Sequence, residues 1–258
     1  MTTNPRRHPL TLKDLAHHLG ISRTTASNAF NRPDQLSGEL RERILETARE
    51  LGYPGPNPMA RKLRTGRAGS IGLLFSEPLP FAFADPTAIA LLQGVAQVCE
   101  RYQSGLLLIP VVDADQGAKL VAEAAVDGFL IYCLPEVSPV VPQALERGLP
   151  AVAVDQRGIE DISSVGIDEG LAARQAAEHL LALGHRRIAV LSLDLRDDLH
   201  AGQLTPERRQ RAEYHTTLAR LESYEATLQA AGVDTAGLVI LECPNNSEEH
   251  ARRLSREL

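Results

Sequence analysis

Apolar residues near the start of the chain recur at the spacing of amphipathic helices. Positions i, i+3, i+4 and i+7 are occupied by Leu12, Leu15, Ala16 and Leu19. This spacing predicts a helix that Thr11 caps and that Gly20 ends. A second helix is predicted over residues 23–31 behind the cap Ser22, and a third over residues 38–51. Three helices of this length can enclose a small core.

The predicted second helix has one small apolar face and one polar face. Its inward positions are Ala26, Ala29 and Phe30, and its outward positions are Arg23, Thr24, Thr25, Ser27 and Asn28. Short polar side chains on the exposed N-terminal half of a helix can reach base edges in a DNA major groove. The three-residue turn that begins at Gly20 therefore favours a helix-turn-helix, although two helices of a plain bundle can share this spacing.

The segment YPGPNPMARKLRTGRAGS follows the third helix and combines prolines with cations. Asn57 and Pro58 offer a cap and a first-turn proline for a short helix over residues 59–64. In that helix the apolar Ala60 and Leu63 lie among arginine and lysine side chains. An apolar wedge flanked by cations is suited to the DNA minor groove. A solvated charged linker is the alternative interpretation.

From Ser70 onward, short apolar runs alternate with helical stretches. Strands are expected at residues 70–75, 105–112, 128–133, 150–155, 163–167, 186–193 and 237–243. Helices are expected at residues 86–102, 114–126, 138–147, 169–183, 206–231 and 246–257. Such alternation predicts parallel sheets covered by helices on both faces. Ligands of these folds usually bind beyond the carboxyl ends of the strands.

Charge divides the chain into a basic head and an acidic body. The chain has a net charge of −6, but residues 1–67 hold 12 Lys+Arg against 6 Asp+Glu, and the remainder holds 15 against 27. A basic head is what a phosphate-binding module requires. Neither a signal peptide nor an apolar membrane span is found, so we expect a cytoplasmic protein with no membrane partner. The three cysteines form no CxxC pair, which argues against a metal site.

The segments TLKDLAHHLGISRTTASNAFN and LRERILETARELGYPGPNPMARKLRTGRAGSIGLLF together resemble the lactose-repressor (LacI-type) family of bacterial regulators. The resemblance implies that Arg23, Thr24 and Asn28 read bases. It implies that the DNA backbone is positioned by Ser22, Thr25, Ser27, Asn31, Tyr53 and Asn57, with Thr11 in the same DNA-binding set, and that Ala60 and Leu63 form the hinge wedge. The family often has arginine where Asn28 stands, and asparagine favours an adenine edge over guanine.

The body is similar to the periplasmic-binding-protein-like effector domain of that family, most clearly in DGFLIY, LPAVAVDQ, VGIDE and AAEHLLALGHRRIAVL. The resemblance implies effector contacts at Asp155, Arg220 and Phe83. An ion pair is the alternative role for Asp155 and Arg220. Phe81 and Asp85 lie in the same loop as Phe83, and Asp85 before Pro86 also fits a helix cap.

The resemblance implies three parts: a helix-turn-helix domain over residues 1–56, a hinge over 57–67 and an effector-sensing domain over 68–258. Family members continue beyond the position of Leu258. We therefore expect an incomplete second lobe with exposed apolar surface and an impaired effector response.

The predicted function is a DNA-binding regulator, most simply a repressor, that binds a palindromic operator as a homodimer and responds to a small effector such as a sugar. Two rival functions are an enzyme and a solute-binding protein. The chain contains no GxGxxG, GxxxxGK[ST], HExxH or GxSxG motif, so no catalytic residue, cofactor or metal site is predicted. The basic head argues against a solute-binding protein.

Overall fold

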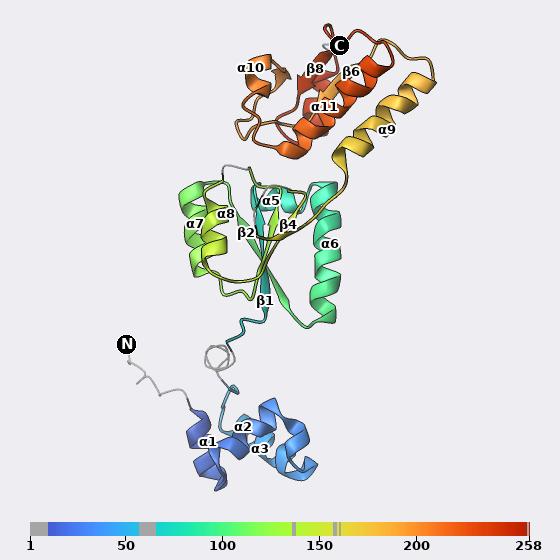
Figure 1. Ribbon diagram of the computed structural model, residues 1–258. Helices are drawn as coiled ribbons and strands as arrows, with labels where there is room; N and C mark the ends of the chain where they lie inside the picture. The colour runs from blue at the N-terminus through green and yellow to red at the C-terminus, as the bar shows by residue number, and fades with distance from the viewer. Residues whose placement is uncertain (1–9, 57–65, 136–137, 157–158, 160, 257) are drawn as a thin grey trace. The chain divides into compact units, whose positions relative to one another are not determined.

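The computed structural model describes residues 10–56, 66–135, 138–156, 159, 161–256 and 258. The chain divides into two compact units, residues 1–67 and 68–258. Figure 1 shows the helical N-terminal unit and the α/β unit. Each unit is described separately below.

The described residues of the N-terminal unit form three α-helices, α1 (Leu12–Leu19), α2 (Arg23–Asn31) and α3 (Gly38–Glu50), with a short 3-10 turn between the last two. All three have the predicted bounds to within one residue. Their core is closed by apolar side chains from each helix and from the segment after α3: Leu15, Ala29, Ile44, Ala48 and Tyr53. Gly20 ends α1 in the left-handed conformation, which a glycine adopts without steric strain.

The first lobe of the larger unit is a five-stranded parallel sheet with the order β2-β1-β3-β4-β5. Its strands are β1 (Ser70–Phe75), β2 (Gly105–Pro110), β3 (Phe129–Tyr132), β4 (Ala151–Val154) and β5 (Ser163–Val165). Helix α6 (Pro86–Arg101) covers one face of this sheet, and α7 (Ala114–Glu123) and α8 (Val140–Glu146) cover the other (Figure 1). The predicted parallel sheet with two covered faces is confirmed.

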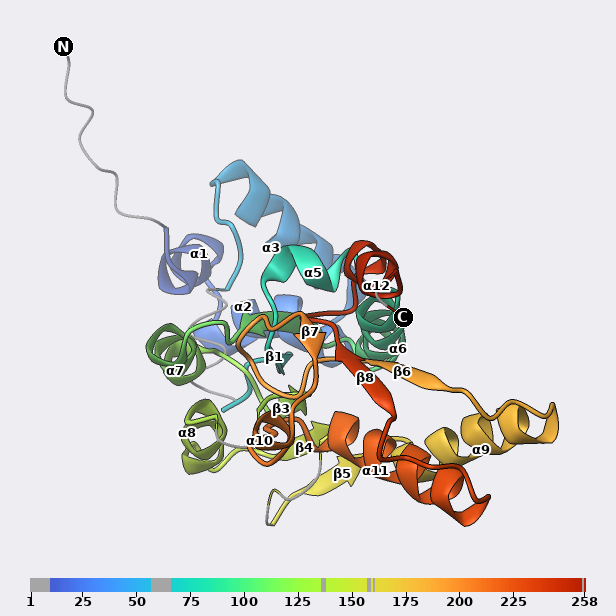
Figure 2. The same cartoon turned by 90° about the horizontal axis from the view of Figure 1, so that it is seen from above.

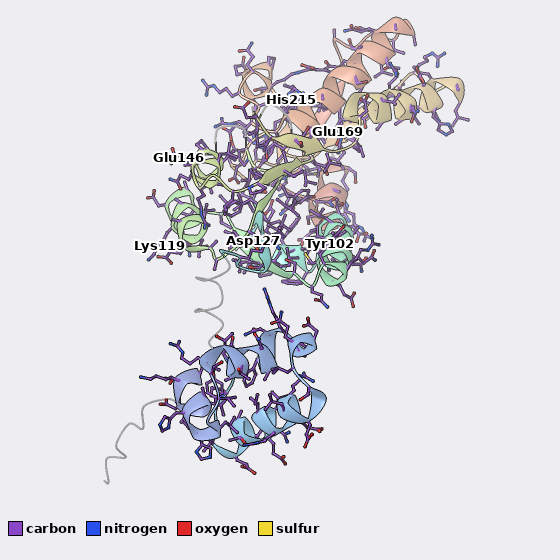
Figure 3. The ribbon with its side chains drawn as sticks, turned by 60° about the horizontal axis from the view of Figure 1, so that its bottom comes forward. Tyr102, Lys119, Asp127, Glu146, Glu169 and His215 are labelled. Carbon is purple, nitrogen blue, oxygen red and sulfur yellow. The ribbon has the colours of Figure 1, made fainter. Side chains whose placement is uncertain are left out.

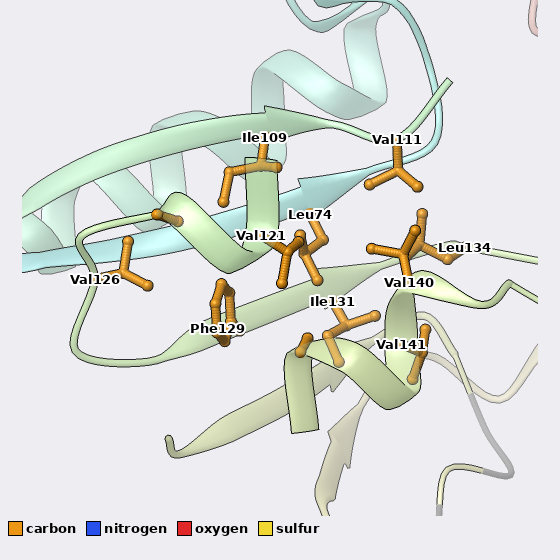
Figure 4. Close-up of a cluster of buried hydrophobic side chains, with 12 residues drawn as sticks. Leu74, Ile109, Val111, Val121, Val126, Phe129, Ile131, Leu134, Val140 and Val141 are labelled. Carbon is orange, nitrogen blue, oxygen red and sulfur yellow. The ribbon is translucent and has the colours of Figure 1, made fainter. Parts of the chain in front are cut away.

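The main core of this lobe lies between the sheet and the α7–α8 face. Phe129 and Ile131 of β3 pack against Val121 of α7 and Val140 of α8, and all four are buried (Figure 4). The guanidinium carbon of Arg147 lies 5.4 Å from the centre of the Phe129 ring and closes the lower end of the cluster. Burial of this apolar surface stabilises the packing of α7 and α8 on the sheet and so fixes the positions of the strand ends.

The second lobe begins at α9 (Glu169–Ala182), which packs along α11 (His215–Ala230) (Figures 1 and 2). Its sheet has the order β6-β8-β7, formed by β6 (Ala189–Ser192), β7 (Gly202–Gln203) and β8 (Val239–Glu242). Two further helices are α10 (Pro206–Arg209) and α12 (Glu248–Leu254). Several large apolar side chains of this lobe are exposed: Leu171, Leu180, Leu183, Leu191, Leu199 and Val239.

Two expectations for the second lobe are wrong. The single helix over residues 206–231 is divided into α10 and α11, because the N–H groups of Glu213 and Tyr214 donate to the carbonyl oxygen of Leu195 at 2.7 and 3.2 Å instead of continuing a helix. The second sheet is not wholly parallel, because the two-residue β7 pairs antiparallel with β8. A strand of two residues carries no readable alternation.

One short helix was not predicted in the loop after β1. Helix α5 (Leu79–Ala82) begins directly after Pro78 and buries Ala82. Its four residues are too few to produce a helical pattern in the sequence. The turn that it makes decides which aromatic side chain of this loop reaches the site.

Candidate DNA-binding surface and effector cleft

Capping side chains hold the two helices of the helix-turn-helix in place. Thr11 and Asp14 form a reciprocal capping box at the start of α1. Ser22 Oγ accepts the Thr25 N–H at 2.9 Å and lies 2.8 Å from Thr25 Oγ1. These bonds satisfy backbone donors that the first turn of a helix otherwise leaves unpaired. Thr11, Ser22 and Thr25 therefore have structural roles in addition to the DNA contacts predicted for them.

The predicted base-reading residues lie on the outer side of α2. Arg23 and Thr24 are exposed, and Asn28 is half-buried. Asn28 Nδ2 donates to Gln35 Oε1 at 3.1 Å, which orients the Asn28 amide. Asn31 Nδ2 donates to the Ser27 carbonyl oxygen at 3.1 Å, so those two residues brace the last turn of α2.

Tyr53 differs from the other predicted DNA-binding residues because its side chain is buried. The ring packs edge-on against Phe30, with 5.8 Å between the ring centres and 78° between the planes. This packing holds the segment after α3 against α2. The predicted hinge residues Asn57, Ala60 and Leu63 lie outside the described residues.

A carboxylate fixes the chain where it enters the α/β unit. Asp127 Oδ1 and Oδ2 accept the N–H groups of Ala68 and Gly69 at 2.5 and 2.7 Å, and the Asp127 N–H donates to the Ser70 carbonyl oxygen at 2.8 Å. Figure 3 places Asp127 at the end of the first lobe that lies away from Glu169 and His215. The segment leading into β1 is thus held by two charge-assisted hydrogen bonds.

A cleft of about 200 Å³ lies between the two lobes of the α/β unit. It opens at the carboxyl ends of the parallel strands, as this class of fold predicts. Residues that directly follow the strands contribute to its lining: Ser76, Glu77, Cys133, Asp155, Asp194, Asn245 and Asn246. Its volume is below the range of about 300–1,000 Å³ typical of sites for drug-sized ligands, so it suits a small molecule.

Asp155 and Arg220, the two charged residues for which effector contacts were predicted, both line this cleft. Asp155 directly follows β4 and has a φ of 49°. Its Oδ1 lies so close to Gly166 that a Cβ at position 166 would be only 2.9 Å away, so glycine at this position leaves room for the Asp155 carboxylate. Arg220 of α11 forms an ion pair through Nε with Glu169 Oε2 at the start of α9. The ion-pair alternative raised for Arg220 is therefore present within the cleft itself.

Phe81, and not Phe83, is the aromatic residue of the α5 loop that lines the cleft. Phe83 lies outside the lining with 68% of its surface exposed, because α5 turns its side chain away. Asp85 has the expected capping role, since its Oδ1 accepts the Ala88 N–H at 2.8 Å. Its Oδ2 accepts from Asn246 Nδ2 at 2.6 Å, which joins the two lobes across the cleft.

Two acidic residues of the cleft were missed in the sequence. Burial raises the pKa of Asp194 to about 7 and also raises the pKa of Glu77, and the nearby charge of Glu77 contributes to the shift of Asp194. Burial likewise raises the pKa of Asp155. Both missed residues come just after predicted strands, and that position was the available signal.

A buried ion pair in the second lobe holds the loop that follows Asp194. Glu242 of β8 is fully buried, accepts the Leu195 N–H at 2.8 Å and accepts from Arg208 Nε at 2.6 Å. Arg208 also contacts both carboxylate oxygens of Asp198, at 2.6 and 2.8 Å. The loop after Asp194 is therefore held at Leu195 by Glu242 and at Asp198 by Arg208.

Uncharged hydroxyl groups complete the lining. Tyr132, Tyr214, Thr216 and Thr217 contribute to the cleft, and burial raises the pKa of both tyrosines. Burial raises the pKa of the Cys133 thiol to about 11, which makes it unreactive near neutral pH. Among the described residues, no group of three or more His, Cys, Asp or Glu side chains is placed to hold a metal ion.

Comparison with known proteins gives two adjoining family matches. Residues 11–57 match the family described as bacterial regulatory proteins, lacI family. Residues 68–256 match the periplasmic binding proteins and sugar binding domain of LacI family. This chain belongs to the LacI family. The larger match includes residues of both lobes, so the cleft of this LacI-family regulator lies within the region that matches the family's sugar binding domain.

Relatives of similar sequence are named as transcriptional regulators. An HTH-type transcriptional regulator of Mycobacterium tuberculosis is 43% identical over 246 residues, which cover 94% of this chain and 68% of the relative. The HTH-type transcriptional regulator IpsA of Corynebacterium glutamicum is 42% identical over 254 residues, covering 96% and 70%. These relatives are thus named for a class of protein that is not enzymatic.

Solved structures agree with both units of the fold. A LacI-family transcriptional regulator from Corynebacterium glutamicum has a TM-score of 0.68 at 37% identity, covering 97% of this chain and 71% of that one. The regulator CelR in complex with cellobiose has a TM-score of 0.59 at 27% identity, covering 96% and 69%. No helix in the described part of the chain is long and apolar enough to cross a membrane.

Proposed function

We propose that this LacI-family regulator is a repressor that binds a palindromic operator as a homodimer and releases it when a sugar-type effector occupies the cleft. The observation that carries the proposal is the capped α2 helix, which presents Arg23 and Thr24 to solvent from a closed three-helix core. The basic charge of residues 1–67 supplies the attraction for DNA phosphates.

Base reading is assigned to Arg23, Thr24 and Asn28. Arg23 has the donors to bind a guanine edge or a phosphate, and the amide of Asn28 suits an adenine edge. Ser22, Thr25, Ser27 and Asn31 position α2 through the hydrogen bonds at its two ends. Because a single recognition helix spans only a few base pairs, two copies are needed for a specific site.

An apolar surface on the first lobe supports the dimer. The strand β2 is an edge of the sheet and exposes Leu107, and Val98 and Tyr102 lie one turn apart at the end of α6 with 52% and 74% of their surface exposed. Contiguous exposed apolar side chains beside an edge strand are typical of a contact surface between proteins. We assign this surface to the partner copy.

Effector binding at the cleft would alter the position of one lobe of the α/β unit relative to the other. The two lobes are joined there by the Asp85–Asn246 hydrogen bond. The change would reach the hinge through the strand that begins at the Asp127 anchor. The repressor would then shift away from the DNA-competent population. The CelR–cellobiose complex supports a sugar as the class of effector.

The proposal is tested by selecting bound sequences from a random DNA duplex library with the purified chain at two salt concentrations. We expect a palindrome whose affinity falls steeply with salt, because phosphate contacts release counterions. Arg23→Ala and Asn28→Ala should weaken binding to the selected operator by about 1–3 kcal/mol each. Arg174→Ala, on the exposed side of α9, is the matched control. Selection of no sequence, or equal loss with the control, would refute the proposal.

The hinge part is tested separately by Leu63→Ala. A leucine wedge that enters a base step contributes only on DNA, so operator affinity should fall markedly while the circular dichroism spectrum and melting temperature stay unchanged. An unchanged affinity would remove Leu63 from the mechanism.

A further inference from the structure

We propose that the cleft is built for an effector without negative charge, an uncharged polyhydroxylated compound, and that it discriminates against phosphorylated or carboxylated forms of the same compound. The inference rests on the proposed function, in which this cleft is the effector site. It goes further by assigning a charge class that the family match does not specify.

The charge balance of the lining carries the inference. Five carboxyl groups face the cleft: Glu77, Asp85, Asp155, Glu169 and Asp194. Among the described lining residues, the only arginine or lysine is Arg220, and its Nε is already bonded to Glu169 Oε2. The carboxyl groups without a cationic partner come from both lobes, since Glu77 follows β1 and Asp194 follows β6.

The geometry of these carboxyl groups leaves hydrogen-bond acceptors for hydroxyl groups. Asp85 uses both oxygens within the protein, on the Ala88 N–H and on Asn246 Nδ2. Glu77, Asp155 and Asp194 face the space between the lobes. Burial raises the pKa of all three, and each of them still keeps some contact with solvent. Hydroxyl groups of a ligand would replace that solvent and donate to these oxygens.

A phosphate or carboxylate group on the ligand would instead be repelled by these carboxyl groups. A phosphate monoester carries about −1.5 to −2 charges at pH 7 and only accepts strong hydrogen bonds. Repulsion between like charges is stronger in a partly desolvated cleft than in water. Arg220 is the single cation among the described lining residues, and its pairing with the nine-tenths-buried Glu169 carboxylate offsets part of the charge that it presents to an anion. Both effects lower the affinity for anions.

The test is isothermal titration of the full chain with a panel of probes: free monosaccharides, disaccharides and alditols, each with its phosphate ester and its sugar-acid counterpart. We expect at least one neutral member to bind and its anionic counterparts to bind at least tenfold more weakly. Operator release by the same compounds, measured by fluorescence anisotropy, should follow the same order.

Charge variants separate repulsion from shape. At a pH above the raised pKa of Asp194, the preference of Glu77→Gln/Asp194→Asn for the neutral compound over its phosphate should shrink at least threefold, because two ionisable carboxyl groups are replaced by neutral amides of nearly the same volume. Glu178→Gln, on the exposed side of α9, is the matched control and should leave the preference unchanged. Thermal melting of each variant verifies that it is folded.

The outcomes distinguish the inference from the proposed function. Anionic members that bind as tightly as their neutral parents, or a preference that the double variant leaves unchanged, would overturn the charge inference while the effector site stands. If no member of the panel binds, both the sugar-type effector and the inference are wrong. Neutral binding with a reduced preference in the double variant supports both.

Discussion

Replacing Glu242 with glutamine removes the charge at the centre of the buried network that supports the cleft loop. The Glu242 side chain is fully buried and accepts three hydrogen bonds, from the Leu195 N–H at 2.8 Å, Arg208 Nε at 2.6 Å and Arg208 Nη2 at 2.8 Å. A glutamine of the same shape keeps one acceptor oxygen, but its amide group turns a donor towards the guanidinium. The substitution therefore leaves a mostly buried cation with one carboxylate, that of Asp198.

The magnitude follows from burial and from the partner that remains. Breaking a buried ion pair by removing one member costs about 3–5 kcal/mol. Arg208 keeps both contacts to Asp198 and has 13% of its side chain exposed, so we place the loss of unfolding free energy nearer to about 2–3 kcal/mol. For a unit of this size the melting temperature should fall by about 4–12 °C.

Urea unfolding followed by circular dichroism measures the loss, with Glu248→Gln as the matched control. Glu248 pairs with Arg252 one turn away at 2.6 Å, but their side chains are 77% and 75% exposed. An exposed helical pair contributes about 0.3–0.5 kcal/mol. Hydrogen exchange at the Leu195 amide should accelerate only in Glu242→Gln. Equal losses in the two variants, or an unchanged Leu195 exchange rate, would refute the argument that burial makes this network strong.

Three further predictions follow from the described contacts. Ser22→Ala should lower the stability of the N-terminal unit by about 1 kcal/mol in thermal unfolding, because α2 loses its cap, and Ser255→Ala, outside that unit, should not. Asp127→Ala removes two charge-assisted hydrogen bonds and should speed amide exchange at Ala68 and Gly69; unaltered exchange would exclude Asp127 as the anchor. The raised pKa of Asp194, caused by burial and by the charges of Glu77, Glu242 and Asp197, means that the folded state binds a proton more tightly than the unfolded chain. Stability should therefore decline as pH rises from about 4 to about 7, and urea unfolding of Asp194→Asn should show a weaker decline.

The local pattern of the N-terminal unit was sufficient to predict its three helices and their caps. Thr11, Ser22 and Gly20 act on the few residues beside them, and the spacing of Leu15 with its neighbours leaves one way to close a small core. The order of the longer strands and helices in the body was predicted for the same reason, whereas the short α5, β7 and α10 were not. Apolar runs between turns mark buried parallel strands whatever their order in the sheet.

The lining of the cleft could not be predicted in full from the sequence, because it is formed by contacts between distant parts of the chain. Asp155 could be placed at a strand end from its sequence position, but the bond between Arg220 and Glu169 joins residues 51 positions apart, and that between Asp85 and Asn246 joins residues 161 positions apart. The break between α10 and α11 likewise follows from the Leu195 carbonyl, which accepts the backbone donors of a segment distant in sequence.

The sequence by itself thus determined the helix-turn-helix, the succession of the longer strands and helices and the family, because these depend on neighbouring residues and their periodicity. Only the tertiary structure decided which side chains share the cleft, that Phe81 lines it in place of Phe83, and that the single arginine among the described lining residues is paired with Glu169. The physical reason is that charge balance and hydrogen bonding in a cleft depend on how far apart groups lie in space, and the spacing of residues along the chain does not specify that distance.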